Sequence, residues 1–322
     1  MYEGSKKEEY RAFCERRAEV PLFLQPWWLD AVTEPDGKVW DVLLARNNQN
    51  EIEAVFPFVK GCKRGIRYAI TPQLTQYTGL WIVDKEGEDM AERLSREKKL
   101  QNDIIAQLEA LHLNYFDVRF PLNYTYWSPF YWAGYKQETR YTYRIEDLSD
   151  MEKVLQGLDY AKVKQLRKAK EAGIEVDYGM SADELYDLQC EQLKERGSRD
   201  VLSRALVQSV VEASCRRGQG LIVRAKDAEG HTHAAVFVVW DTNSAWELIS
   251  AISPAYRSTG ASTLVVIEAM KQVAGRTKSW DFEGSMIEPV EASFRQFGGL
   301  PVPYMTITKK SKLISLIELC RK

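Results

Sequence analysis

The sequence predicts an α/β protein with a mixed sheet, built from two tandem units. Its 322 residues are enough for about two domains, each with its own apolar core. Predicted strands and helices are interspersed along the chain, which favours α/β layers. The two halves also repeat one order of elements at a fixed offset, which indicates an internal duplication.

Apolar periodicity and turn residues place the elements of the first half. Residues 47–50 form a turn between two strands, and an apolar stripe that includes Ile104 and Leu108 marks the long helix. The expected elements are a helix at 6–17, a short helix at 26–32, strands at 39–46, 51–60 and 64–70, a helix at 88–113, a strand at 115–120, a short helix at 127–132 and a strand at 135–145.

Helix caps add to the evidence in the second half. Gly173 ends one helix as a C-terminal cap, and Ser181 with Glu184 forms a capping box at the start of the next. The expected elements are a helix at 160–172, a helix from 181, a helix at 203–217, strands at 221–226, 233–240 and 244–251, a helix at 261–273, a strand at 279–283, a helix at 288–297 and a strand at 302–308.

The repeat appears when the first half is shifted by 164 residues without a gap. Four identities then follow one another in order: Asp117 with Asp281, Phe130 with Phe294, Gly134 with Gly298, and Thr142 with Thr306. We expect two similar units with a cleft between them. The predicted domains are a first unit at 1–145, a basic helical connector at 146–180 and a second unit at 181–322.

Composition excludes several classes of protein. Lys and Arg number 44 against 46 Asp and Glu, so overall charge does not hold the chain to nucleic acid, although a local basic patch remains open. The longest wholly apolar run, 234–240, is too short to span a bilayer, and residues 1–10 have no apolar core of a secretory signal. Five widely spaced cysteines predict reduced thiols and a cytoplasmic location: Cys14, Cys62, Cys190, Cys215 and Cys320.

Two histidines stand two residues apart at the start of a predicted strand. His231 and His233 could share a face as metal ligands, or they could form the polar end of a hairpin after the turn at 227–230. The sequence offers no evident third ligand. We therefore expect no metal site.

The segment 256–262 joins a strand to a helix and is a candidate phosphate loop. Free backbone N–H groups and the helix dipole favour an anion there, Gly260 permits close approach, and Arg257 adds positive charge. On the next strand, alternation sends Asp281 and Glu283 to one face, where a carboxylate could take a proton from an amine or could shape the turn. We prefer Glu283 as the base, because the aligned residue of the first half is Arg119.

Two further groups admit two interpretations each. The basic helix that carries Lys164, Arg167 and Lys168, together with Lys162 and Lys170, is either a solvated face or a grip on phosphate. Aromatic residues such as Tyr77 and Trp127 either pack in the core or line an acceptor cleft.

The element order and the Arg257-x-x-Gly260-Ala261 motif resemble the GNAT acetyltransferase superfamily. Two such units in tandem, with the strings at 166–176, 280–286 and 294–299, resemble its FemAB-like branch, which includes bacterial peptidoglycan-bridge enzymes. The motif departs from the family pattern at its last position, Ser262.

The resemblance implies transfer of an acyl or aminoacyl group to an amino group of a small molecule or peptide. Acyl-CoA, or an aminoacyl-tRNA, would be the cosubstrate, with no permanently bound cofactor, no DNA and no membrane span. The motif positions that would hold the donor pyrophosphate are Arg257, Ser258, Thr259, Gly260, Ala261 and Ser262. The second unit would then bind the donor and the first the acceptor. The alternative is a catalytically silent module that binds a peptide or a sugar.

Overall fold

The computed structural model describes residues 3–198, 202–284, 286–312 and 314. The chain divides into two compact units, unit 1 (Met1–Arg140 and Pro303–Lys322) and unit 2 (Tyr141–Val302). Each unit combines helices with a mixed sheet, which confirms the predicted α/β class. The four cysteines within the described residues are free thiols, and Cys320 lies outside them.

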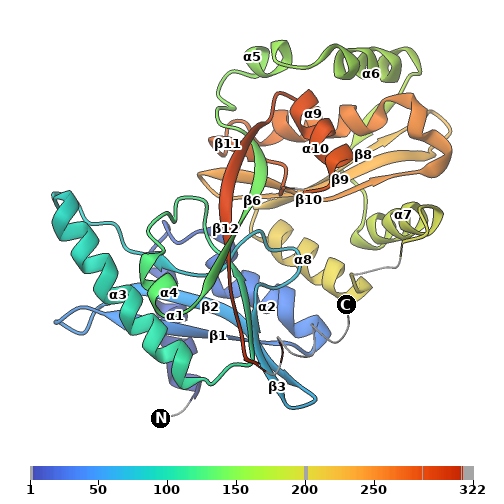
Figure 1. Cartoon of the computed structure of the whole chain (residues 1–322). Helices are drawn as coiled ribbons and strands as arrows, with labels where there is room; N and C mark the ends of the chain where they lie inside the picture. Colours follow the sequence, from blue (N-terminus) through green and yellow to red (C-terminus); the bar gives the residue numbers. More distant parts are fainter. Residues whose placement is uncertain (1–2, 199–201, 285, 313, 315–322) are drawn as a thin grey trace. The chain divides into compact units, whose positions relative to one another are not determined.

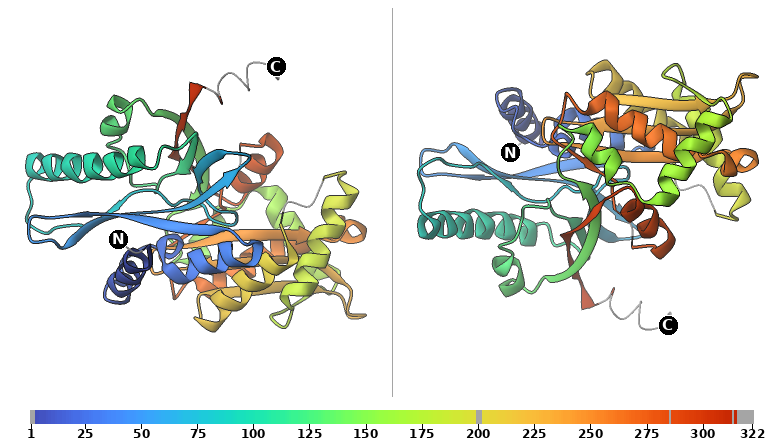
Figure 2. Two further views of the ribbon diagram at one scale, coloured as in Figure 1. Left: turned by 90° about the horizontal axis from the view of Figure 1, so that it is seen from below. Right: turned by 90° about the horizontal axis from the view of Figure 1, so that it is seen from above.

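Unit 1 is a sheet in the order β1-β2-β3-β5-β12, with β4 paired to β2. Figure 2 shows α3 along one face of this sheet, with α1 and α2 on the other. Aromatic side chains such as Phe56, Phe116 and Phe120 fill the core. The elements are α1 (Glu3–Glu15), η1 (Leu22–Leu24), α2 (Pro26–Thr33), η2 (Glu34–Asp36), β1 (Val39–Arg46), β2 (Ile52–Lys63), β3 (Ile66–Ile70), β4 (Trp81–Ile82), α3 (Met90–Ala110), β5 (Tyr115–Arg119), α4 (Ser128–Trp132), and parts of β6 (Lys136–Ile145) and β12 (Leu300–Lys310).

Unit 2 is a sheet in the order β6-β11-β10-β9-β8-β7. Figure 1 shows α9 on one face of this sheet and α7 and α8 on the other. Since β9 and α9 are buried along most of their lengths, they form the centre of the core. The elements are α5 (Met151–Gln156), α6 (Tyr160–Glu171), β7 (Glu175–Asp177), α7 (Ala182–Glu195), α8 (Arg204–Arg216), β8 (Gly220–Lys226), β9 (Thr232–Trp240), β10 (Ser244–Ile252), η3 (Pro254–Thr259), α9 (Ala261–Val273), β11 (Ser279–Asp281) and α10 (Glu288–Gln296).

Two strands pass from one unit into the other. β6 begins in unit 1, and its last residues pair with β11 in unit 2. β12 begins in unit 2, and its last five residues pair with β5 in unit 1. The unit bounds therefore differ from the predicted domains. The prediction placed the whole of β6 in the first unit and the whole of β12 in the second. The predicted connector also packs within unit 2, where Leu148, Val154 and Ala169 are buried in the core.

The 164-residue offset recurs in the elements themselves. β5, α4 and β6 are followed at that spacing by β11, α10 and β12. Gly134 and Gly298, which the offset aligns, both have a positive φ, of 81° and 85°. Left-handed backbone favours glycine, so the same turn geometry accounts for glycine at both positions.

Most predicted elements are present within two or three residues of their expected ends, and the capping box of Ser181 and Glu184 is formed. β4, α5 and β7 were not predicted, because segments of two to six residues carry too little periodicity. The strand expected at 279–283 ends at Asp281, since Glu283 and Gly284 have positive φ values of 62° and 77°.

Candidate functional site

A break in the pairing of β10 marks a distinctive position in unit 2. β11 pairs with β10 in parallel only from Ser244 to Trp246. Beyond that point β10 continues beside β9, with a register shift between Glu247 and Ile249. Within the described residues, this stretch of β10 has no strand partner on the β11 side. An open strand edge can hydrogen-bond an extended ligand.

Glu247 stands where this unpaired stretch begins. Its Oε2 atom is buried and makes no hydrogen bond within the described part of the chain. Burial raises the pKa of Glu247 to about 7, although a hydrogen bond from Ser250 and the charge of Lys162 act in the opposite direction. A carboxyl group with such a pKa can accept or release a proton near neutral pH.

Lys162 on α6 is the cation that acts on Glu247. Its side chain is buried, with Nζ donating to Ser293 Oγ at 2.9 Å and lying 4.1 Å from the centroid of the Phe297 ring. Burial lowers the pKa of Lys162 to about 8, against the effect of the Glu247 and Asp159 charges. Two neighbouring groups that titrate near neutrality are typical of functional sites.

The predicted phosphate loop is η3 followed by Gly260, the N-cap of α9. Gly260 has a φ of 84°, and a β-carbon there would lie 2.0 Å from the carbonyl oxygen of Gln165 on α6. The glycine therefore permits the close approach of α6. This is a different reason from the one inferred from the sequence, which was the approach of a phosphate.

Side-chain contacts hold the loop in place. Arg257 forms an ion pair with Glu195 at the end of α7. Thr259 donates its hydroxyl hydrogen to the Tyr256 carbonyl at 2.8 Å, and its oxygen lies 3.2 Å from His233 Nδ1. The other motif residues range from buried to exposed: Ala261, Ser262 and Ser258.

The basic helix and the loop, predicted separately, lie together in unit 2. α6 packs against both η3 and the start of α9, as Figure 1 shows for the two helices. Lys164, Arg167 and Lys168 are exposed on α6, and Arg167 forms an ion pair with Glu171 at 3.7 Å. The arrangement adds positive charge beside the N-terminus of α9.

The two predicted carboxylates have different environments. Asp281 is fully buried, and its Oδ1 accepts hydrogen bonds from the Thr142 hydroxyl at 2.5 Å and the Glu283 amide at 2.8 Å. Its Oδ2 lies 3.7 Å from Nη1 of Arg144. Asp281 thus ties the end of β11 to β6. Glu283 follows the strand and is half-buried, so strand alternation does not set its direction.

Tyr77 and Trp127 belong to unit 1. Tyr77 is buried, with its ring edge-on to Phe23 at 5.3 Å, and Trp127 precedes α4 with its ring 5.6 Å from that of Tyr131. A cavity of about 660 Å³ in unit 1 is lined by other residues, among them the charged side chains of Arg46, Glu53 and Lys85. The structure thus places both predicted aromatics in packing contacts.

Sequence reasoning missed Glu247. The available signal was that Glu247 is the one charged residue in the sequence from Ser244 to Ile252. Charged residues are rarely buried in a strand unless they are paired or functional, so this position was detectable. The sequence identified Lys162 only as one of several basic residues on the helix at 160–172. In the structure its side chain is buried, whereas Lys164 and Lys168 are exposed.

Residues 160–281 match the model of the acetyltransferase (GNAT) domain family. Among solved structures, that of FemX has a TM-score of 0.69 at 10% identity, covering 93% of this chain and 95% of that one. The segment 160–281 is therefore similar to a GNAT domain, and the chain as a whole shares the fold of FemX. Other solved structures share this fold at low identity, and no curated protein gives a significant match.

Two of these further matches are informative. A tandem GNAT protein from the clavulanic acid biosynthesis pathway has a TM-score of 0.55 at 13% identity, covering 95% of each chain. The L-PGS of Bacillus licheniformis has a TM-score of 0.57 at 11% identity, covering 98% of this chain and 96% of that one. The family model over residues 160–281 indicates acyl transfer in general terms, whereas these likenesses show a shared fold. No helix among the described residues is long and apolar enough to cross a bilayer.

Proposed function

We propose that this protein is an N-acyltransferase that moves an acyl or aminoacyl group from a CoA thioester to an amino group of a small molecule or peptide. An aminoacyl-tRNA is the alternative donor, and both donors belong to the cytoplasm. The observation that carries the proposal is the carboxylate of Glu247, whose Oε2 atom is buried without a hydrogen bond within the described residues, at the point where β10 loses its partner strand. The GNAT domain match over 160–281 supports the same reaction class.

The donor is proposed to lie along the open stretch of β10. Backbone groups there can bind an extended pantetheine arm in the manner of an added strand. Its phosphates would reach the start of α9, where Arg257 through Ser262 and the exposed Lys164 and Lys168 of α6 supply N–H groups and positive charge. The unpaired strand and the charged helix start belong to the same unit, which supports a single donor site.

Glu247 is proposed as the general base. An acceptor amine enters as an ammonium ion, whose proton passes to the Glu247 carboxylate. The freed nitrogen lone pair attacks the thioester carbonyl carbon, the carbon–sulfur bond breaks, and the thiolate leaves. The thiolate takes the second proton of the attacking nitrogen and becomes the free thiol of CoA, while Glu247 passes the first proton to solvent. Lys162, with a pKa of about 8, is placed to return a proton to the site. Every proton and electron pair is thus accounted for without a metal or a permanent cofactor.

Glu283 remains the competing candidate for the base. It was preferred from the sequence, and its half-buried place after β11 leaves it accessible. The observation that favours Glu247 is that burial raises its pKa to about 7. Asp281 is proposed as a structural residue, since its Oδ1 is committed to Thr142 and the Glu283 amide.

The test begins with donor binding. Acyl-CoAs are added in a thermal-unfolding screen, and a donor at 100 times its Kd should stabilise the fold by about 2.7 kcal/mol. Release of free CoA is then followed with a panel of amines. If no acyl-CoA binds and no CoA is released, acyl transfer from CoA is refuted. An aminoacyl-tRNA assay then separates the alternative donor from a silent binding module.

Three variants assign the base. Glu247→Gln should lower kcat by about 10²- to 10⁴-fold while the donor Kd stays unchanged. Glu175→Gln, an exposed carboxylate on β7, is the matched control and should be neutral. Glu283→Gln is measured alongside. A large loss in Glu283→Gln with a near-normal Glu247→Gln would transfer the role of base to Glu283.

A further inference from the structure

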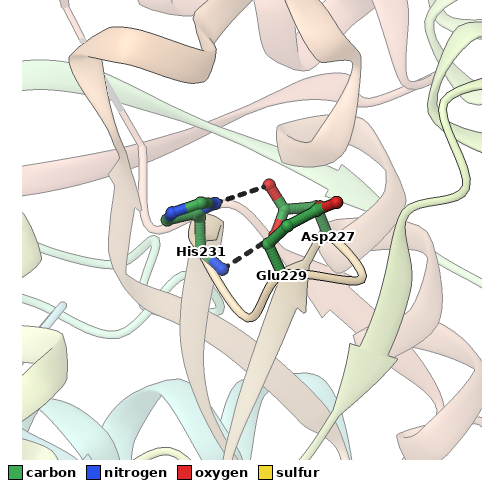
Figure 3. Close-up of side chains that lie close together, drawn as sticks. All are labelled: Asp227, Glu229 and His231. Atoms are coloured by element: carbon green, nitrogen blue, oxygen red, sulfur yellow. Dashed lines mark hydrogen bonds and ion pairs between the residues drawn. The ribbon is translucent and has the colours of Figure 1, made fainter.

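We propose that the turn between β8 and β9 binds one divalent transition-metal ion of the Zn²⁺ class, through His231, His233 and Asp227, with Glu229 as a further ligand. The site does not include the proposed base Glu247, and its test does not depend on acyl transfer, although His233 contacts Thr259 of the proposed donor loop. Figure 3 shows the His231 ring and the Asp227 carboxylate turned toward each other, with Glu229 beside them. Donor atoms of these three residues all lie within 4.8 Å of one another.

Two imidazole rings are directed at the same carboxylate oxygen. Asp227 Oδ2 lies 3.0 Å from His231 Nδ1 and 3.1 Å from His233 Nε2. His233 is buried, with 4% of its surface exposed, so its direction is fixed by packing. Tyr256 stacks on this ring with 3.9 Å between centroids and 5° between planes.

The contacts of His233 direct its Nε2 atom at the Asp227 carboxylate. The single hydrogen of the Thr259 hydroxyl is donated to the Tyr256 carbonyl. With that hydrogen committed, His233 Nδ1, which lies 3.2 Å from the hydroxyl oxygen, is placed to donate to it. A neutral imidazole has only one N–H, so Nε2 then turns a lone pair toward the Asp227 carboxylate. Two lone pairs at 3.1 Å repel each other unless a proton or a metal ion lies between them.

A metal ion accounts for more of the arrangement than a proton does. A metal ion would use both rings and the carboxylates at once. Imidazole with carboxylate is a donor set suited to zinc and its neighbours, and metal-bound histidines usually donate their other N–H to a fixed acceptor. The Nδ1 contact of His233 with Thr259 has that form.

The spacing is compatible with an ion. With bonds of about 2.1 Å, donor atoms about 3 Å apart subtend an angle of about 90° at the metal, and a few tenths of an ångström of relaxation gives a tetrahedral arrangement. His231 and Glu229 are exposed and free to make that adjustment. Through His233 and Thr259, the ion would connect the β8–β9 turn to the loop before Gly260.

The test measures metal binding by the whole chain. The protein is stripped with a chelator, and ZnCl₂ is titrated in by calorimetry and in competition with a chromophoric chelator. We expect one Zn²⁺ per chain with a micromolar or tighter Kd, and no binding of Mg²⁺ at the same concentrations. Zn²⁺ should also raise the Tm of the stripped protein.

Matched variants locate the ion. His231→Ala, whose side chain is largely exposed and leaves the fold intact, should weaken Zn²⁺ binding at least tenfold, and Asp227→Asn should do the same. His112→Ala removes the third histidine of the chain, which is exposed in unit 1, and should change nothing. Binding that survives in His231→Ala, or no binding together with a nitrogen NMR spectrum of doubly protonated His233, would overturn the proposal.

Discussion

Glu247→Gln should stabilise the folded protein, and the gain should grow with pH. The amide keeps the size of the side chain but cannot ionise. In the wild type, burial raises the pKa of Glu247 from 4.5 to about 7, so the fold favours the neutral carboxyl group. That contribution to stability is complete below pH 4.5 and is lost as the pH rises through 7.

The size of the effect follows from the two pKa values. A rise from 4.5 to about 7, at 1.36 kcal/mol for each tenfold change in the ionisation constant, corresponds to about 3 kcal/mol. The free energy of unfolding of the wild type should fall by about this amount between pH 4.5 and 7 relative to Glu247→Gln. Lys162, with a pKa of about 8, is protonated throughout this window.

Urea denaturation at half-unit steps from pH 4.5 to 7.5 measures the difference directly. Glu175→Gln serves as the control for a change of net charge, because that side chain is exposed. Parallel stability curves for the wild type and Glu247→Gln across the whole range would show that the carboxylate is not desolvated. The assignment of Glu247 as a base near neutral pH would then lose its physical ground.

Three further outcomes are expected. Asp281→Ala should cost about 2–4 kcal/mol in urea denaturation, because it leaves buried donors without an acceptor; a change under 0.5 kcal/mol would contradict that role. Gly260→Ala should destabilise the protein well beyond Gly173→Ala, since both have positive φ but only the former meets the Gln165 carbonyl; equal losses of Tm would contradict the contact. Burial raises the pKa of Asp177, but hydrogen bonds from Arg224 and Lys226 lower it to about 2. The ion pair of Asp177 with these cations should therefore weaken only as the pH falls from about 4 to 2. NMR titration of the Asp177 carboxyl carbon measures this change.

Local chemistry made much of the fold predictable. The capping box at Ser181 and the glycine after α6 fixed helix ends, and alternation located β1 and β8–β10 closely. These features depend on neighbours in sequence, which a single sequence contains. The paths of β6 and β12 from one unit into the other depend on which strands they pair with. Their residue patterns suit a strand in unit 1 and a strand in unit 2 equally well.

The candidate site was predictable only where it follows a motif. The loop before α9 and the basic face of α6 were found from residue type and order. The burial of Glu247 arises from helices that are distant in sequence, and the orientation of the Asp227 carboxylate toward two histidines arises from the backbone of one turn. A search for lone charges in apolar strands would have found Glu247, but no spacing rule would have found the role of Asp227.

The crossing of β6 and β12 bears on how the chain acquires its structure during synthesis. β5 in unit 1 receives its antiparallel partner only when residues 306–310 have been made, almost two hundred residues later. Such pairing between distant segments slows folding, because a long loop must close first. Until then one side of β5 is an unpaired strand edge, which attracts other chains.

The same connectivity decides which fragments can be expressed. A fragment that ends at residue 145 carries β6 without β11 and leaves β5 without β12, so it exposes two unmatched strands. A fragment of Tyr141–Val302 keeps β6 with β11 and all the strands of the unit 2 sheet. This fragment lacks most of β12, the other neighbour of β6, so both cuts fall inside strands at bounds that no linker in the sequence marks.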